Sequence, residues 1–156
     1  MPSGLSLPRA GGKFLTLRYL LDTNVISEPV RPKPNRAVMG KLRLYQEEIA
    51  TATVVWHELL FGCQRLPESK KRRTITTYLK YVVQPHVPLL PYDKTAATWH
   101  AKERTRLVTA GQTPAFVDGQ IAAIAYANNL ILVTNNTSDF ENFSDLRLEN
   151  WHQPEL

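Results

Sequence analysis

Short apolar runs of strand length recur along the chain, and longer stretches with helical spacing separate them. The predicted strands cover residues 18–21, 48–52, 87–90, 130–133 and, at an edge of the sheet, 146–149. Strands that alternate with helices are typical of an α/β fold. The pattern therefore predicts a three-layer domain with a mostly parallel central sheet flanked by helices.

Helix boundaries are marked most clearly in the second half of the chain. Asp93 can cap a long helix that runs to about residue 109, and Gly111 can end it. Thr113 and Pro114 form a cap followed by proline, which predicts the start of the next helix. That helix is expected to reach about residue 128.

The chain has the length and composition of one globular domain. It has 156 residues, of which 43% are hydrophobic and 21% are charged, and this mixture excludes wholesale disorder. Glycines and prolines break every local pattern in residues 1–16, so this segment is predicted to be a flexible extension. The folded domain is then expected at residues 17–156.

Cysteine content and hydropathy restrict the compartment. Cys63 is the only cysteine, so the chain has no internal disulfide, and a reducing compartment, the cytoplasm, is expected. No apolar run reaches the length that spans a bilayer, so no membrane association is expected. The formal charge of +5 slightly favours a polyanionic partner such as nucleic acid.

Several catalytic motifs are excluded by single residues. His57 and Glu58 could begin the zinc motif H-E-x-x-H, but Phe61 stands where the second histidine is needed. Gly40 and Lys41 lack the other residues of a phosphate-binding loop. The sequence also contains no G-x-S-x-G nucleophile motif.

Four acids occupy positions that invite a functional explanation. Asp22 and Asp139 follow predicted strands, and the carboxyl ends of parallel strands are favoured places for ligands. Glu58 and Asp118 lie among the apolar residues of predicted helices. Each has an ordinary alternative. Asp22 can be a turn residue, and Asp139 can lie in a solvated loop. A slight rotation of its helix can turn Glu58 to solvent or into an ion pair with Arg65, and Asp118 can complement the helix dipole.

Convergence of these acids would need compensation. Two carboxylates about 4 Å apart repel by about 4 kcal/mol at an effective dielectric constant near 20. Bound divalent cations or raised pKa values can offset this repulsion. An all-oxygen site suits Mg²⁺ or Mn²⁺ better than Zn²⁺, and such ions can activate water against a phosphodiester.

The segments around these acids resemble a known family. They read Leu-Asp-Thr-Asn-Val-Ile-Ser, Trp-His-Glu-Leu, Asp-Gly-Gln-Ile-Ala-Ala-Ile-Ala and Thr-Asn-Asn-Thr-Ser-Asp-Phe. In this order they resemble the motifs of PIN-domain ribonucleases, and more closely those of VapC-type toxins of bacterial toxin–antitoxin systems. The resemblance covers residues 17–152.

The resemblance implies a Mg²⁺-dependent endoribonuclease that cleaves single-stranded RNA. It further implies a homodimer that is silenced by a VapB-type antitoxin, whose C-terminal tail covers the active groove. By resemblance the metal-binding and catalytic residues are Asp22, Glu58, Asp118 and Asp139, and the supporting residues are Asn24 and Thr134.

Two departures and two other functions stay open. The family often has arginine where this chain has Asn135, and alanine where it has Gly119. A non-catalytic protein- or RNA-binding module is one alternative function. A haloacid-dehalogenase-like phosphatase is the other, although that family begins with Asp-x-Asp and Asn24 stands at the second acidic position.

Overall fold

A five-stranded parallel sheet forms the centre of the computed structural model, which describes residues 6–8 and 14–152. The strands lie in the order β5-β4-β3-β6-β7, and every neighbouring pair is parallel. Their bounds are β3 (Tyr19–Leu21), β4 (Ile49–Ala52), β5 (Leu89–Leu90), β6 (Ile131–Val133) and β7 (Leu148–Glu149). The predicted α/β fold with a parallel sheet is therefore confirmed, and β7 lies at an edge as expected.

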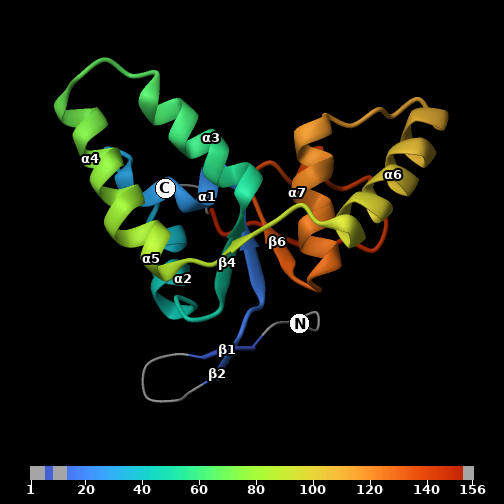
Figure 1. Cartoon of the computed structure of the whole chain (residues 1–156), viewed down its shortest axis with the longest axis horizontal. Helices are drawn as coiled ribbons and strands as arrows, with labels where there is room; N and C mark the ends of the chain where they lie inside the picture. Colours follow the sequence, from blue (N-terminus) through green and yellow to red (C-terminus); the bar gives the residue numbers. More distant parts are fainter. Residues whose placement is uncertain (1–5, 9–13, 153–156) are drawn as a thin grey trace.

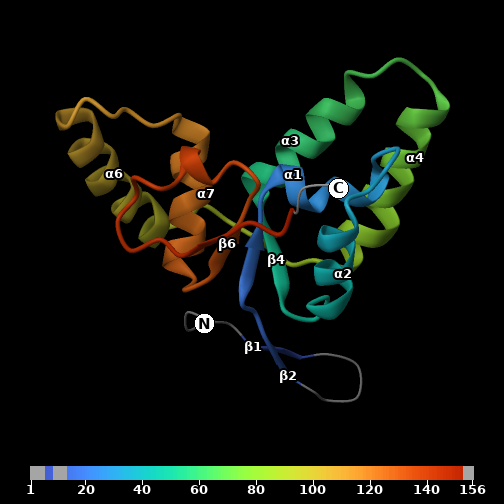
Figure 2. The same ribbon diagram turned by 180° about the vertical axis from the view of Figure 1, so that it is seen from behind.

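Helices form two arms with the strands between them (Figures 1 and 2). One arm holds α6 and α7, and the other holds α3 and α4. The helices are α1 (Thr23–Ile26), α2 (Arg36–Leu44), α3 (Thr53–Gln64), α4 (Lys70–Tyr78), α5 (Gln84–His86), α6 (Lys94–Thr109) and α7 (Phe116–Ala127). A π-helical segment, η2 (Leu79–Val83), joins α4 to α5, and the short 3₁₀ helices are η1 (Glu28–Val30) and η3 (Thr137–Asp139).

The core is built around the central strand β3, whose three residues are fully or almost fully buried. Small residues on α7, including Ala122 and Ala123, are fully buried as well. Small side chains let a helix axis approach its neighbours closely, and α7 packs along α6. The position of α7, and of any residue on it, is thus fixed by close packing.

The ends of α6 agree with the sequence pattern. Asp93 is the N-cap, and its side chain accepts a hydrogen bond from the backbone N–H of Ala96 at 2.9 Å. After the helix, Gly111 has a φ of 72°. Its N–H donates to the carbonyl of Val108 at 3.0 Å, and that of Gln112 donates to the carbonyl of Leu107 at 2.8 Å. These two bonds form a Schellman motif, which explains the need for glycine.

The next helix starts later than predicted. The pattern places its beginning at Thr113 and Pro114, but α7 begins at Phe116, with Ala115 as its N-cap. The residues that follow the Schellman motif therefore form a loop between α6 and α7. The two predicted boundary residues belong to that loop rather than to the helix.

An antiparallel pair of strands, β1 (Ser6–Pro8) and β2 (Phe14–Thr16), precedes the domain. Both lie away from the two helical arms (Figures 1 and 2). The sequence pattern missed this pair because glycine and proline interrupt the segment. The rest of the predicted extension, residues 1–5 and 9–13, lies outside the described residues, so its flexibility and the boundary at residue 17 stay predictions.

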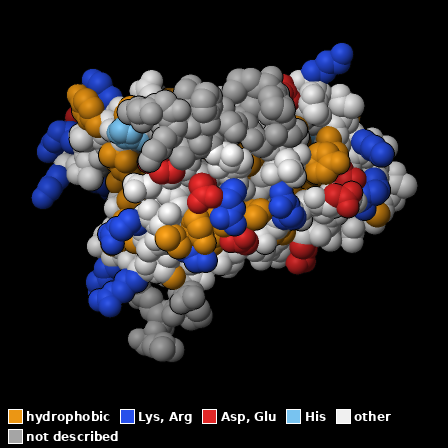
Figure 3. Space-filling model, turned by 90° about the horizontal axis from the view of Figure 1, so that it is seen from below, with side chains coloured by type: hydrophobic (Ala, Val, Ile, Leu, Met, Phe, Trp, Pro, Cys, Tyr) orange, Lys and Arg blue, Asp and Glu red, His pale blue; other side chains and the backbone are white. Residues whose placement is uncertain are grey.

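Charged side chains are mixed on the face that Figure 3 shows. Lys and Arg are scattered over it, with Asp and Glu among them. The described residues of this face therefore form no continuous basic patch. Among the helices that the structure describes, none combines the length and the apolar character that crossing a membrane requires.

Candidate functional site

Asp22 lies at the carboxyl end of the central strand and is only 7% exposed. Its backbone N–H donates to the carbonyl of Val133 at 2.9 Å, which joins it to strand β6. Oδ1 accepts a hydrogen bond from the N–H of Thr23 at 2.8 Å, because Asp22 is the N-cap of α1. Oδ2 accepts hydrogen bonds from Thr134 Oγ1 at 2.9 Å and from Asn24 Nδ2 at 3.3 Å. The carboxylate is thus fixed on both oxygens.

The surroundings of Asp22 have opposing effects on the pKa of its carboxyl. Burial raises the pKa of this carboxyl above its usual value, and the hydrogen bonds from Thr23, Thr134 and Asn24 act against that rise. The negative charge of Asp139 adds to the rise. The net direction is upward, so the ionised form of Asp22 is destabilised in the folded protein.

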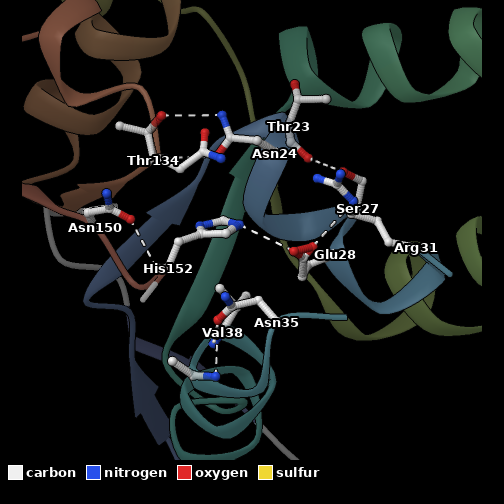
Figure 4. A network of polar contacts seen from close by, with 12 residues as sticks. Thr23, Asn24, Ser27, Glu28, Arg31, Asn35, Val38, Thr134, Asn150 and His152 are labelled. Atoms are coloured by element: carbon white, nitrogen blue, oxygen red, sulfur yellow. Dashed lines mark hydrogen bonds and ion pairs between the residues drawn. The ribbon is translucent and has the colours of Figure 1, made fainter. Parts of the chain in front are cut away.

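Thr134 connects the first part of the chain with the loop after β6. It is fully buried, and its hydroxyl donates to Asp22 while it accepts from the N–H of Asn136 at 3.0 Å. Asn24 reaches the same loop, because its Oδ1 accepts from the N–H of Asn135 at 2.9 Å and its Nδ2 lies 3.3 Å from Thr134 Oγ1 (Figure 4). These contacts join residues about 110 positions apart in the sequence. Asn135 contributes its backbone, and its side chain is exposed.

Glu58 reaches the site from helix α3. Its side chain is half-buried, and Thr23 Oγ1 donates to its Oε2 at 2.9 Å. The alternative pairing of Glu58 with Arg65 is wrong, since the guanidinium of Arg65 lies over the ring of Phe61, 5.2 Å from its centre. Thr23 therefore positions a carboxylate that is 35 residues away in sequence. Thr23 is not among the residues that the sequence predicts for the site, and its position directly after Asp22 is the one local signal for it.

Asp118 lies in the first turn of α7 and is half-buried. Burial raises its pKa most, and the charges of Asp139, Asp22 and Glu58 raise it further, to about 6. Asp139 itself is exposed, at the end of η3. Because three other carboxylates act on Asp118, the structure brings the four predicted acids together at one end of the sheet.

These four acids do not form a finished metal cage. Within residues 6–8 and 14–152, no three side chains of His, Cys, Asp or Glu already cluster closely enough to hold a metal ion. The donors are nevertheless all carboxylate oxygens, and they are ones whose mutual repulsion a cation would relieve. Their chemistry therefore fits a hard divalent cation such as Mg²⁺.

A second polar network supports α1 from below the site (Figure 4). Glu28, only 3% exposed, follows α1, and its Oε1 lies 3.3 Å from Nε2 of His152. Its Oε2 lies 3.7 Å from Nε of Arg31. The segment that carries Asp22 is thus joined to the residues after the last strand.

An unpredicted contact lies behind Asp118. His100 of α6 is 1% exposed, and its Nδ1 is 2.7 Å from the hydroxyl of Tyr92. Its other side faces Gly119 so closely that a Cβ there would lie 2.2 Å from Nε2. This explains why the chain has glycine at a position where alanine would otherwise fit a packed helix. Gly119 stands out in the sequence as a departure from the family motif, but no local pattern indicates that His100 is its neighbour.

The parallel sheet, the buried aspartate after its central strand and the convergent acids define the class of protein. The chain belongs to the PIN domain family, which it matches over residues 19–146. The resemblance found in its sequence motifs is thereby confirmed.

Individual relatives are similar over nearly their whole length. The chain is 35% identical over 136 residues to toxin FitB of Neisseria gonorrhoeae, covering 85% of this chain and 98% of FitB. It is 32% identical over 137 residues to the tRNA(fMet)-specific endonuclease VapC of Shigella flexneri, covering 86% and 98%. Among solved structures, VapBC2 of Rickettsia felis bound to a DNA fragment from its promoter contains a similar chain, with a TM-score of 0.74, 28% identity and coverage of 86% and 99%.

Proposed function

We propose that this protein is a Mg²⁺-dependent endoribonuclease that acts as the toxin of a toxin–antitoxin pair. The observation that carries the proposal is the convergence of four carboxylates, since the charges of Asp139, Asp22 and Glu58 add to the effect of burial in raising the pKa of Asp118. The relatives named as a toxin and as an endonuclease support the same function. The reaction is hydrolysis of an RNA phosphodiester, in which water attacks phosphorus and leaves a 5′-phosphate and a 3′-hydroxyl.

Each residue of the site has a distinct part. Asp22 and Asp118 are the principal metal ligands, and Glu58 and Asp139 complete the carboxylate set. When bound, Mg²⁺ supplies an activated water and stabilises the leaving oxygen.

The polar neighbours act on the ligands. Thr134 and Asn24 hold the carboxylate of Asp22 through its Oδ2, and Thr23 holds that of Glu58. Asp118 must lose its proton to serve as a metal ligand. Its pKa of about 6 leaves the carboxyl mostly ionised at neutral pH, which meets this requirement.

The partners follow from the same family. The substrate is single-stranded RNA, and the regulator is a VapB-type antitoxin. The similarity to a chain in the solved VapBC2 structure supports this partner. The functional unit is a homodimer in the cytoplasm. These assignments rest on the relatives and on family resemblance.

RNA cleavage is the direct test. The wild-type protein should cleave a single-stranded RNA in Mg²⁺ and stop in EDTA. Replacing a residue that only hydrogen-bonds to a metal ligand costs about 10- to 100-fold in activity. Replacing a ligand itself, as in Asp22→Asn or Asp118→Asn, should therefore lower activity by more than about 100-fold. Asp145→Asn is the matched control, since Asp145 is exposed and contributes nothing to the pKa of Asp118. Metal-independent cleavage, or full activity in both ligand variants, would reject the proposal.

Two further measurements separate the proposed function from its two alternatives. Mg²⁺ that binds only the folded protein should raise the melting temperature of the wild type and leave that of Asp118→Asn unchanged. A pure binding module would show no such Asp118-dependent shift. A phosphatase of the haloacid-dehalogenase type would form a phosphoaspartate at Asp22, which mass spectrometry of the trapped protein would detect.

A further inference from the structure

A pocket of about 390 Å³ opens beside the carboxylate site, between the end of α6 and the loop after η3. Asp118 and Asp139 line one side of it, and Gln112, Thr113 and Asn142 line the rest of its polar surface. Its volume lies in the range of small-ligand sites. The pocket and the carboxylate site therefore share two acids and form one continuous surface.

The first wall of this pocket is held by the Schellman motif at the end of α6. The bond from the N–H of Gln112 to the carbonyl of Leu107 spans 2.8 Å, and Gly111 makes the turn with its φ of 72°. The backbone at Gln112 is therefore fixed, while its side chain is exposed. This side of the pocket is therefore preformed in the absence of a ligand.

The second wall is held by an ion pair on α6. Glu103 is 4% exposed, and both of its oxygens accept hydrogen bonds from Arg106, at 2.9 and 3.0 Å. Arg106 also donates to the backbone carbonyl of Asn142 at 2.7 Å, and Glu103 accepts from the N–H of Ser144 at 2.5 Å. The hydrogen bonds from Arg106 hold the pKa of Glu103 below its usual range, so the pair stays charged at neutral pH. The loop that carries Asn142 is thus fixed through its backbone.

The polar side chains of the pocket remain free to bind. Within the described part of the chain, the amides of Gln112 and Asn142 and the hydroxyl of Thr113 have no hydrogen-bond partner. Amides offer a donor and an acceptor side by side, which matches the edge of a nucleobase. The lining contains no Lys or Arg, so it does not suit a phosphate.

We propose that this pocket binds one unpaired base of the RNA, next to the phosphate at the four acids, and sets the base preference of cleavage. Gln112 and Asn142 read the edge of that base. The inference rests on the proposed function, because it needs the scissile phosphate at Asp118 and Asp139. It adds residues that contact substrate and lie outside the carboxylate set.

The test compares cleavage positions in a single-stranded RNA of random sequence. The 5′ ends of the products are sequenced for the wild type, Gln112→Ala, Asn142→Ala and the control Gln46→Ala, which removes an exposed amide from the loop after α2. The wild type should favour one base at one position beside the cut. Loss of a good bidentate contact to a base is worth about 1–3 kcal/mol, so either pocket variant should reduce that preference about tenfold. The control should keep it.

The outcomes separate this inference from the proposed function. Cleavage by the wild type without base preference, or with a preference that survives in Gln112→Ala and Asn142→Ala, overturns the pocket assignment and leaves the nuclease intact. No cleavage of any RNA overturns both. Melting temperatures equal to that of the wild type show that a lost preference is not caused by unfolding, as expected for exposed side chains.

Discussion

Gly119→Ala tests whether the contact between α6 and α7 behind Asp118 is as tight as the structure shows. The added Cβ would lie 2.2 Å from Nε2 and 2.7 Å from Cδ2 of His100. The ring has little room to retreat, because His100 is 1% exposed, lies 2.7 Å from Tyr92 and packs 5.0 Å from the ring of Phe116. Alanine should therefore destabilise the protein, although it is the better helix former.

The size of the effect follows from two opposing contributions. Overpacking a core costs about 1–3 kcal/mol, and this overlap is severe enough to expect the upper end. The helical preference of alanine over glycine offsets about 1 kcal/mol of that cost. A net loss of about 2 kcal/mol should remain, which lowers the melting temperature of a chain of this size by about 4–8 °C.

A second background makes the prediction sharp. In His100→Ala the ring that the new Cβ would strike is absent, so only the helical preference remains. Gly119→Ala should then stabilise the protein by up to about 1 kcal/mol. Urea unfolding of the wild type, both single variants and the double variant measures the change of sign. If Gly119→Ala destabilises by the same amount in both backgrounds, His100 is not the cause.

Three further predictions concern pH, a buried hydroxyl and a turn. The pKa of Asp118 is raised from 3.8 to about 6 in the folded state. The metal-free protein should therefore be more stable below about pH 4, and its free energy of unfolding should fall as the pH rises through about 6. Urea unfolding in EDTA should show a smaller fall in Asp118→Asn. Thr134→Val should cost about 1–3 kcal/mol, because Asp22 and the N–H of Asn136 lose a buried partner, whereas Thr134→Ser should cost less. Gly111→Ala should cost about 1–2 kcal/mol at its φ of 72°, and Gly111→Asn less, in thermal unfolding.

Each of these predictions has a result that contradicts it. A stability profile of Asp118→Asn identical to that of the wild type would remove Asp118 as the titrating group. Equal losses in the valine and serine variants of Thr134 would mean that shape, not the hydroxyl, matters there. Equal stability of the alanine and asparagine variants of Gly111 would contradict a role for its φ, since no atom lies near enough to clash.

The sequence predicted the sheet because apolar runs of strand length leave few other interpretations. It also located the acids, since Glu58 and Asp118 lie among apolar neighbours where a carboxylate needs a reason. Their convergence could only be inferred from topology. The structure shows this convergence, because the charges of Asp139, Asp22 and Glu58 all act on the carboxyl of Asp118.

The details that the sequence missed depend on contacts between distant segments. Thr23 holds Glu58 across 35 residues, and His100 fills the space left by Gly119. Neither pair has a local pattern. The start of α7 was also misplaced, because Thr113 and Pro114 look like a helix start, whereas the Schellman motif before them leads into a loop.

The strand order of the sheet has a consequence for biosynthesis. Strand β6 lies between β3 and β7, so the central strand β3 obtains one of its two neighbours only after Ile131–Val133 has been synthesised. The hydroxyl that steadies Asp22 arrives in the same late segment. A growing polypeptide therefore has no complete set of four acids until Asp139 has been synthesised.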